Sequence, residues 1–270
     1  AAYLWTKSIA AGVLLVAAIL LGLGSAEKMV NVVSPILALG ALALTTLLLV
    51  FDLKRPDRFL YLFTKSNFRS WLVLGGYILM AYGLAALLWL LQGVLTARIS
   101  GVLAVCTAVL AVASACYSAL LFAQAKGRDF WQSPMFIWHL LAQALIGGSA
   151  CLWMAGTVGH AETGLVRRSA LILLISVAAS FIMVLGEIAL PHAGEDARLA
   201  MRSLTQGRYA ARFWILTIIL GQFLPVGLSA LFLSSVIHSG TAWLGSVAAL
   251  GGLFSFEYLW VKAGQSVPLS

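Results

Sequence analysis

Five ionisable residues lie within or beside long apolar stretches of this sequence: Lys7, Asp52, His139, Glu187 and Glu257. In an apolar environment each such side chain costs on the order of several kcal/mol unless it is paired or functional. Lys and His can donate hydrogen bonds to a ligand oxygen, and carboxylates can take up and release protons. These residues are therefore the first candidates for ligand binding and proton exchange.

The composition predicts the environment that surrounds these residues. Of the 270 residues, 62% are hydrophobic and 10% are charged, and the mean hydropathy is +1.01. A soluble domain cannot bury so much apolar surface, so we predict an integral membrane protein. At about 20 apolar residues per span, the sequence divides into eight candidate helices, near residues 4–23, 34–53, 70–92, 100–124, 135–157, 169–190, 213–236 and 243–262.

The predicted fold class is an all-α integral membrane protein, because the apolar stretches are too long for barrel strands and lack their alternation. The first stretch lacks a convincing basic leader and exceeds the apolar region of a signal peptide, so we expect it to be a spanning helix. Two segments, 51–71 and 186–214, share a span-ending carboxylate, a Pro four residues later and an Arg before the next span. This faint repeat predicts two four-helix bundles, residues 1–125 and 126–270.

Positive charge is concentrated on one side of the predicted bundle. Eight spans place both termini on the same side, and only Lys28, Arg98, Arg167 and Arg168 of the 17 Lys and Arg residues fall on the other. The positive-inside rule then places the side with the termini in the cytoplasm of a bacterial inner membrane. A basic surface that docks a partner would give the same bias, so the opposite orientation remains open.

All five ionisable residues lie toward the side that carries the termini. We expect the chemistry there, and the lack of a carboxylate or Lys chain to the far side argues against proton pumping. Each residue also has a structural alternative. His139, which shares a helix face with Gln143, could bond to a neighbouring carboxylate or carbonyl, and Lys7 could extend to the interface.

Haem and metal ligands are not indicated by the sequence. Of the four His residues only His139 is placed within a span, whereas bis-His haem ligation needs two facing His. Cys106, Cys116 and Cys151 fall inside spans without a CxxC motif, so we expect apolar packing residues and neither an iron–sulfur cluster nor a zinc site in this chain. Tyr117, Gln222 and Pro225 are expected to serve in packing or kinks.

The loop FDLKRPDRFLYLFTKSNFRSW, residues 51–71, mixes Arg with aromatic residues. Such a mixture is enriched in protein interfaces and is too apolar for a loop that is only solvated. We predict that it docks a partner subunit. The residues expected to dock are Lys54, Arg55, Asp57, Arg58, Phe59, Arg69 and Trp71.

This loop resembles the DLGRPxRF region of the NrfD-like family, the polysulfide-reductase-type membrane subunits. WTKSIAAG near the N-terminus and GRYAARFWILTIILGQFLPVGL at residues 207–228 fit the same family. The resemblance implies a haem-free anchor of two four-helix bundles that reacts with menaquinone or ubiquinone. It also implies partners: a ferredoxin-like subunit with four iron–sulfur clusters, and a molybdopterin-type catalytic subunit or a multihaem cytochrome. Thr6, Lys7 and Ser8 stand where some members have a His and an Asn.

The resulting hypothesis is a quinone-interacting membrane anchor that carries no catalytic residue of its own. The candidate quinone-binding residues are His139, Lys7, Gln124, Asp129 and Tyr117, and the candidate proton-exchanging residues are Asp52, Glu187 and Glu257. Besides its partner subunits the protein would contact membrane lipid and no nucleic acid. Two alternatives remain open: a secondary transporter, which would need a polar midplane site, and a purely structural anchor without a quinone site.

Overall fold

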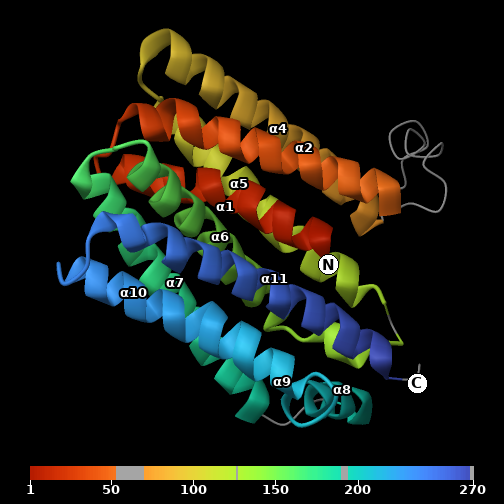
Figure 1. Cartoon of the computed structure of the whole chain (residues 1–270). Coiled ribbons are helices and arrows are strands. Elements are labelled where there is room, and N and C mark those ends of the chain that lie inside the picture. Colours follow the sequence, from red (N-terminus) through yellow and green to blue (C-terminus); the bar gives the residue numbers. More distant parts are fainter. Residues whose placement is uncertain (53–69, 126, 190–193, 268–270) are drawn as a thin grey trace.

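The structure is a computed structural model that describes residues 1–52, 70–125, 127–189 and 194–267, and in these ranges it contains helices and no strands (Figure 1). The candidate spans are Ala2–Gly22 (α1), Met29–Phe51 (η1 and α2), Trp71–Thr96 (α4), Gly101–Ala123 (α5), Phe136–Val158 (α6), Thr163–Ala189 (α7), Ala210–Leu233 (α9, η4 and α10) and Trp243–Ser266 (most of α11). The prediction of eight spans and of an all-α fold is confirmed for the described residues.

The largest difference in span boundaries concerns α7, which begins at Thr163 and not near residue 169. Arg167 and Arg168 lie in its second turn, and their charge made this part of the helix resemble a loop in the sequence. Arg167 donates hydrogen bonds to Ser235 Oγ (3.4 Å) and Leu233 O (2.5 Å). Charged residues therefore do not mark the end of this helix, because α7 continues past its apolar part into the charged segment.

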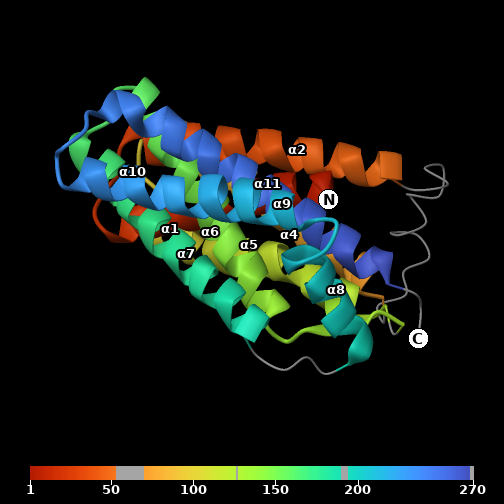
Figure 2. The ribbon, with the colours of Figure 1, turned by 60° about the horizontal axis from the view of Figure 1, so that its bottom comes forward.

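Both termini lie at the same end of the bundle (Figure 1), as the sequence predicted. The segment between α7 and α9 forms a short helix at that end, α8 (Glu195–Thr205), which the sequence had suggested only as a charged loop. Ala200, Met201 and Leu204 of α8 are buried, and the helix packs on α11 (Figure 2). Its short apolar face therefore covers the end of the bundle.

Helix α1 lies at the centre of the fold. It packs against α2, α5, α6 and α11, and Val13, Leu14, Val16 and Leu20 are inaccessible to solvent. A helix that is apolar on all sides is stable only when other helices or lipid surround it. The sequence of α1 is compatible with both environments, and the structure surrounds it with protein.

Helices α1 and α6 meet through residues without side chains. A Cβ atom added to Gly12 would overlap the carbonyl group of Ala144, and one added to Gly148 would overlap the carbonyl group of Gly12. Small residues allow this close backbone approach, which is a common mode of helix association in membranes. The contact joins the two halves of the sequence, and the division into two four-helix bundles stays a prediction.

The seventh span is irregular around Pro225. It begins as α9 (Ala210–Arg212), continues as a π-helix, η4 (Phe213–Phe223), and returns to α-helix in α10 (Leu224–Leu233). Proline cannot donate the backbone hydrogen bond of a regular helix and clashes with the carbonyl four residues before it. The wider turns before Pro225 are a natural way to accommodate it, in keeping with the predicted kink.

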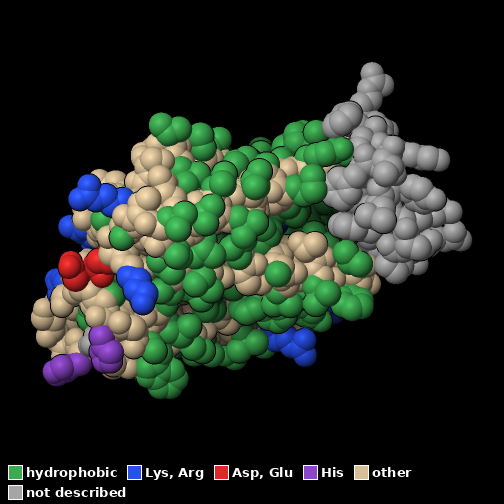
Figure 3. All heavy atoms as spheres, turned by 90° about the horizontal axis from the view of Figure 1, so that it is seen from above, with side chains coloured by type: hydrophobic (Ala, Val, Ile, Leu, Met, Phe, Trp, Pro, Cys, Tyr) green, Lys and Arg blue, Asp and Glu red, His purple; other side chains and the backbone are tan. Residues whose placement is uncertain are grey.

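The outside of the bundle suits a lipid environment. Large apolar side chains of α4 and α5, such as Leu84, Leu95, Val102 and Val109, are more than half exposed. Figure 3 shows hydrophobic side chains along the length of the molecule, and most of the visible Lys, Arg, acidic and His side chains gathered at one end. An apolar surface of this extent on the described residues indicates a multi-pass membrane protein.

Replacing Gly12 with Val should destabilise the protein, because the added atoms would push α1 away from α6. Overpacking of this kind costs about 1–3 kcal/mol. We expect a fall in the thermal unfolding temperature in detergent, measured by fluorescence or by loss of the monodisperse peak. Gly22→Ala is the control, because a Cβ at Gly22 meets nothing within 4 Å. Equal stability of Gly12→Val and Gly22→Ala would contradict the close approach.

Candidate functional site

Neighbouring polar residues near the start of α1 bond to different helices. Trp5 Nε1 donates to Leu250 O of α11 (3.0 Å), and Thr45 Oγ1 of α2 donates to Thr6 Oγ1 (2.8 Å). Because these contacts point in different directions around α1, they fix its rotation as well as its depth. The next two residues, Lys7 and Ser8, continue the pattern toward α5 and α11.

The ammonium group of Lys7 is completely buried between α1 and α5 (0% exposed). Nζ donates hydrogen bonds to Ala115 O and Ser118 Oγ, both at 2.7 Å, and lies 4.8 Å from the centre of the Tyr117 ring. An ammonium has three N–H donors, so two described hydrogen bonds leave one available. The ring face contributes a further favourable interaction with the cation.

The interface alternative for Lys7 is therefore wrong. A Lys that extends to the interface keeps its ammonium in water, whereas this ammonium is turned into the protein. Among the described residues no carboxylate oxygen lies within 4.0 Å of Lys7 Nζ. Burial of a cation on neutral partners is costly, which makes Lys7 a stronger candidate for a functional residue than the sequence alone did.

Ser8 connects α1 to a buried carboxylate on α11. Ser8 Oγ donates to Glu257 Oε1 (3.0 Å), and Glu257 is only 2% exposed. The other carboxylate oxygen, Oε2, has no hydrogen-bond partner among the described residues, and neither has Oε1 of the buried Gln143. Both residues line a small cavity between α1, α6 and α11 that is too narrow for a water molecule. A ligand could reach their unpaired oxygens only if these helices moved apart.

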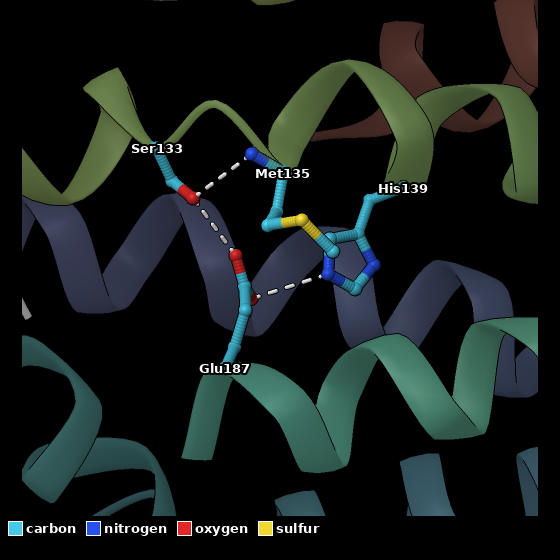
Figure 4. Close-up of polar contacts among 4 residues, drawn as sticks. All are labelled: Ser133, Met135, His139 and Glu187. Atoms are coloured by element: carbon cyan, nitrogen blue, oxygen red, sulfur yellow. Dashed lines mark hydrogen bonds and ion pairs between the residues drawn. The ribbon is translucent and has the colours of Figure 1, made fainter. Parts of the chain in front are cut away.

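His139 and Glu187 form a second buried polar pair, between α6 and α7 (Figure 4). His139 Nε2 lies 3.2 Å from Glu187 Oε2, with His139 fully buried. Ser133 Oγ donates to the other oxygen, Glu187 Oε1 (3.0 Å), and accepts a bond from the Met135 backbone N–H (3.3 Å). Neither ring nitrogen of His139 makes a hydrogen bond of regular geometry among the described residues, and the second one, Nδ1, points away from Glu187 in Figure 4.

Aromatic residues separate the His139 pair from the Glu257 cavity. The His139 ring lies 5.5 Å from the ring of Phe256 and 5.9 Å from that of Trp260, measured between centroids. Trp260 in turn stacks on Phe136 at 5.5 Å. Phe136, Phe256 and Trp260 also line the cavity that holds Glu257. The two polar groups thus share one aromatic wall formed by α6 and α11.

Lys7 and the pair of His139 and Glu187 lie toward the end of the bundle that carries the termini. Lys7 is in the second turn of α1, His139 is three residues after the start of α6, and Glu187 is two residues before the end of α7. This agrees with the side predicted from helix polarity. Glu187 is 8% exposed, so of these buried groups it has the greatest access to solvent.

The structure brings together only part of the predicted binding set. Lys7 and Tyr117 are in contact, and a Cβ at Gly75 of α4 would overlap the Tyr117 ring. Gln124 is exposed just after α5. Asp129 begins the 3₁₀ turn η3 (Asp129–Gln132) beside Gly194, the residue before α8. Asp129 thus lies beside the start of α8, and it is not among the residues that contact Lys7.

The remaining predicted residues are described only in part. Asp52 is the last residue of α2, and its side chain lies outside the described part of the sequence, as do Lys54, Arg55, Asp57, Arg58, Phe59 and Arg69. Trp71 begins α4 and is half-buried. Their assignment to proton exchange and docking stays a prediction. Among the described residues, no three His, Cys, Asp or Glu side chains come together as metal ligands.

Sequence reasoning gave no role to Ser8, Ser118 or Ser133, although each bonds directly to a charged candidate. A signal was present for Ser118, since Thr107, Ser114 and Ser118 recur at helical spacing and mark one polar face of α5. No comparable pattern marks Ser8 or Ser133. Their partners lie 249 and 54 residues away in the sequence.

The fold and these buried contacts define an all-helical membrane subunit whose polar groups gather at one end of its bundle. The profile of the family described as "Polysulphide reductase, NrfD" matches residues 1–268, so the protein belongs to this family. It is also similar to the C subunit of polysulfide reductase from Wolinella succinogenes, with 27% identity over 247 residues that span 82% of this sequence and 77% of the relative. The resemblance noted in the sequence is confirmed, and the protein is a membrane subunit of a respiratory oxidoreductase.

The contacts of Lys7 can be tested by comparing two Ser residues one turn apart on α5. Ser118→Ala removes a hydrogen bond to a buried ammonium, a type of bond worth about 1.5–3 kcal/mol, so the thermal unfolding temperature should fall. Ser114 is equally buried, but its hydroxyl has no described partner, and Ser114→Ala should change stability much less. Similar unfolding temperatures for both variants would contradict the placement of Lys7.

Proposed function

We propose that this protein is the haem-free, quinone-reactive membrane anchor of its complex. It would exchange electrons between menaquinone or ubiquinone in the membrane and a ferredoxin-like iron–sulfur subunit. That subunit would pass them to or from a molybdopterin-type catalytic subunit or a multihaem cytochrome. Family membership and the similarity to the C subunit of a polysulfide reductase support this proposal. The candidate site supplies the physical argument.

The observation that carries the proposal is the pairing of His139 with Glu187 inside the bundle. After a small rotation of its ring, neutral His139 could direct its Nε2–H to the Glu187 carboxylate, whose Oε2 lies 3.2 Å from Nε2. This leaves the lone pair on Nδ1, which can accept a proton from a hydroxyl group. Glu187 would stabilise the resulting imidazolium, as a carboxylate does behind a catalytic His. The pair is thus suited to take a proton from a quinol, and to return it in the reverse reaction.

Lys7 is suited to a different task, the binding of a carbonyl oxygen. Its ammonium is held rigidly by Ala115 O and Ser118 Oγ and retains one donor. A donor fixed in an apolar surrounding stabilises negative charge on a ligand oxygen more strongly than it would in water. Tyr117, whose ring lies beside the ammonium, would form one wall of the binding site.

Proton exchange with the solvent would use Glu187, Glu257 and Asp52. Glu187 is more accessible than Lys7, His139 or Glu257 and bonds to Ser133 in the segment before α6. Glu257 faces the small cavity with one unpaired oxygen. We propose that protons leave on the side of the termini, which the positive-inside rule favours as the cytoplasmic side. The basic segment 54–69 would then dock the iron–sulfur subunit on the same side.

Substitution of His139 by Ala should abolish quinone-linked turnover of the purified complex. Loss of a general base typically lowers a rate by about 10²–10⁴-fold. Turnover of the catalytic subunit with an artificial electron carrier should persist, because it bypasses the membrane anchor. Ser149→Ala is the control: Ser149 is buried on the same helix, but its hydroxyl bonds only to carbonyls of α6 itself. Unchanged quinone-linked turnover in His139→Ala would favour a purely structural anchor.

Substitution of Glu257 by Gln tests the proton route without removing the contact to α1. The amide oxygen of Gln can still accept the hydrogen bond from Ser8 Oγ, so we expect normal thermal stability. Because an amide does not take up a proton at the pH at which the complex works, quinone-linked turnover should fall at least about tenfold. If turnover is unaffected while Ser8→Ala lowers stability, Glu257 has a structural role only.

A further inference from the structure

A separate pocket lies at the opposite end of the bundle from the candidate site. It is formed by the end of α6, the start of α7 and the segment after α10, it is partly open to solvent, and its volume is about 430 Å³. None of the residues assigned to quinone binding or proton exchange lines it. The lining residues with polar side chains are Thr157, His160, Thr163, Arg167, Ser235 and His238.

The charge of this pocket is one-sided. Its lining contains Arg167, His160 and His238 and no Asp or Glu. The guanidinium of Arg167 bonds to two neutral groups, Leu233 O and Ser235 Oγ, and no described carboxylate oxygen lies within 4.0 Å of it. Its charge is therefore not neutralised by the described protein, and an anion would be attracted to it.

The hydrogen-bond donors of the pocket suit a tetrahedral oxyanion. Arg presents several N–H donors that match phosphate oxygens, and Thr163 and Ser235 add hydroxyl groups, whereas the Thr157 hydroxyl already donates to Trp153 O (2.9 Å). Helix α7 begins at Thr163, so the positive end of its dipole lies in the same pocket. His160 and His238 are both exposed and can each donate a hydrogen bond. In Figure 3 His side chains lie beside Lys, Arg and acidic side chains at the end of the molecule opposite to the termini.

The surroundings of the pocket favour a lipid over a free anion. Phe232, Val166 and Ile237 form its apolar part, and Val158 and Val236, next to lining residues in the sequence, are 72% and 66% exposed. Helices α7 and α10, which bound the pocket, carry exposed Leu and Ile side chains along their spans. A phosphate group in the pocket could thus be continuous with acyl chains along the outer surface of these helices.

We propose that this pocket binds the phosphate head group of an anionic phospholipid, with Arg167 as its main contact. The site is independent of the proposed quinone chemistry. The bound lipid would lie at the junction of α6, α7 and α10, at the end of the bundle opposite to the termini.

The adjacent Arg residues of α7 provide a matched test. Arg167 lines the pocket, whereas Arg168 Nη1 bonds to Leu23 O and Ser25 Oγ (both 2.7 Å), at the end of α1. Delipidated full-length protein would be titrated with phosphatidylglycerol, and bound lipid counted by native mass spectrometry. Arg167→Gln should weaken binding of the first lipid about tenfold. Arg168→Gln, which removes the same charge one residue away, should bind it like the wild type.

Further arms separate the possible results. Phosphatidylcholine should bind more weakly than phosphatidylglycerol, and inorganic phosphate alone should not bind at the same concentration. His238→Ala removes only an exposed side chain of the pocket, so the variant should be as stable as the wild type. It should nevertheless bind phosphatidylglycerol more weakly than the wild type does. Equal lipid binding by the wild type and both pocket variants would overturn the proposal. Equal losses in Arg167→Gln and Arg168→Gln, or binding of inorganic phosphate as tight as that of the lipid, would also overturn it.

Discussion

Burial of the Lys7 ammonium constrains the whole first half of the molecule. A cation inside an apolar bundle must meet hydrogen-bond acceptors at short distances, because it has lost those of water. Ala115 O and Ser118 Oγ on α5 supply them at 2.7 Å. This requirement fixes the register of α1 against α5. The neighbouring bonds of Trp5, Thr6 and Ser8 then fix it against α2 and α11.

A central helix held by polar contacts on several sides also needs close backbone approach to its neighbours. Gly12 and Gly148 provide this between α1 and α6, and Gly221 and Gly252 provide it between η4 and α11. At both crossings a side chain would separate the helices and lengthen the polar contacts. The apolar residues supply most of the buried area, whereas the glycines and the few polar residues determine which helix faces which.

The sequence predicted the number of spans, the placement of both termini at one end and the end of the bundle where the buried ionisable groups gather. These follow from hydropathy, from an even number of spans and from helix polarity. It could not predict that His139 pairs with Glu187 or that Ser8 bonds to Glu257, since no local pattern specifies which helices meet. It grouped Gln124 and Asp129 with Lys7 because all lie on one side of the membrane. The structure shows Gln124 exposed beyond α5 and Asp129 beside α8, because position along the membrane normal does not determine position within the bundle.

The central claim is that a quinone head group binds within the bundle near Lys7 and His139. The most direct test is photo-cross-linking of the purified complex in nanodiscs with an azidoquinone, followed by peptide mapping by mass spectrometry. The account predicts labels in the first two turns of α1, the C-terminal half of α5 or the first turns of α6, and loss of labelling in the presence of excess unmodified quinone. Competable labels confined to the opposite end of the bundle, or no competable label, would contradict it.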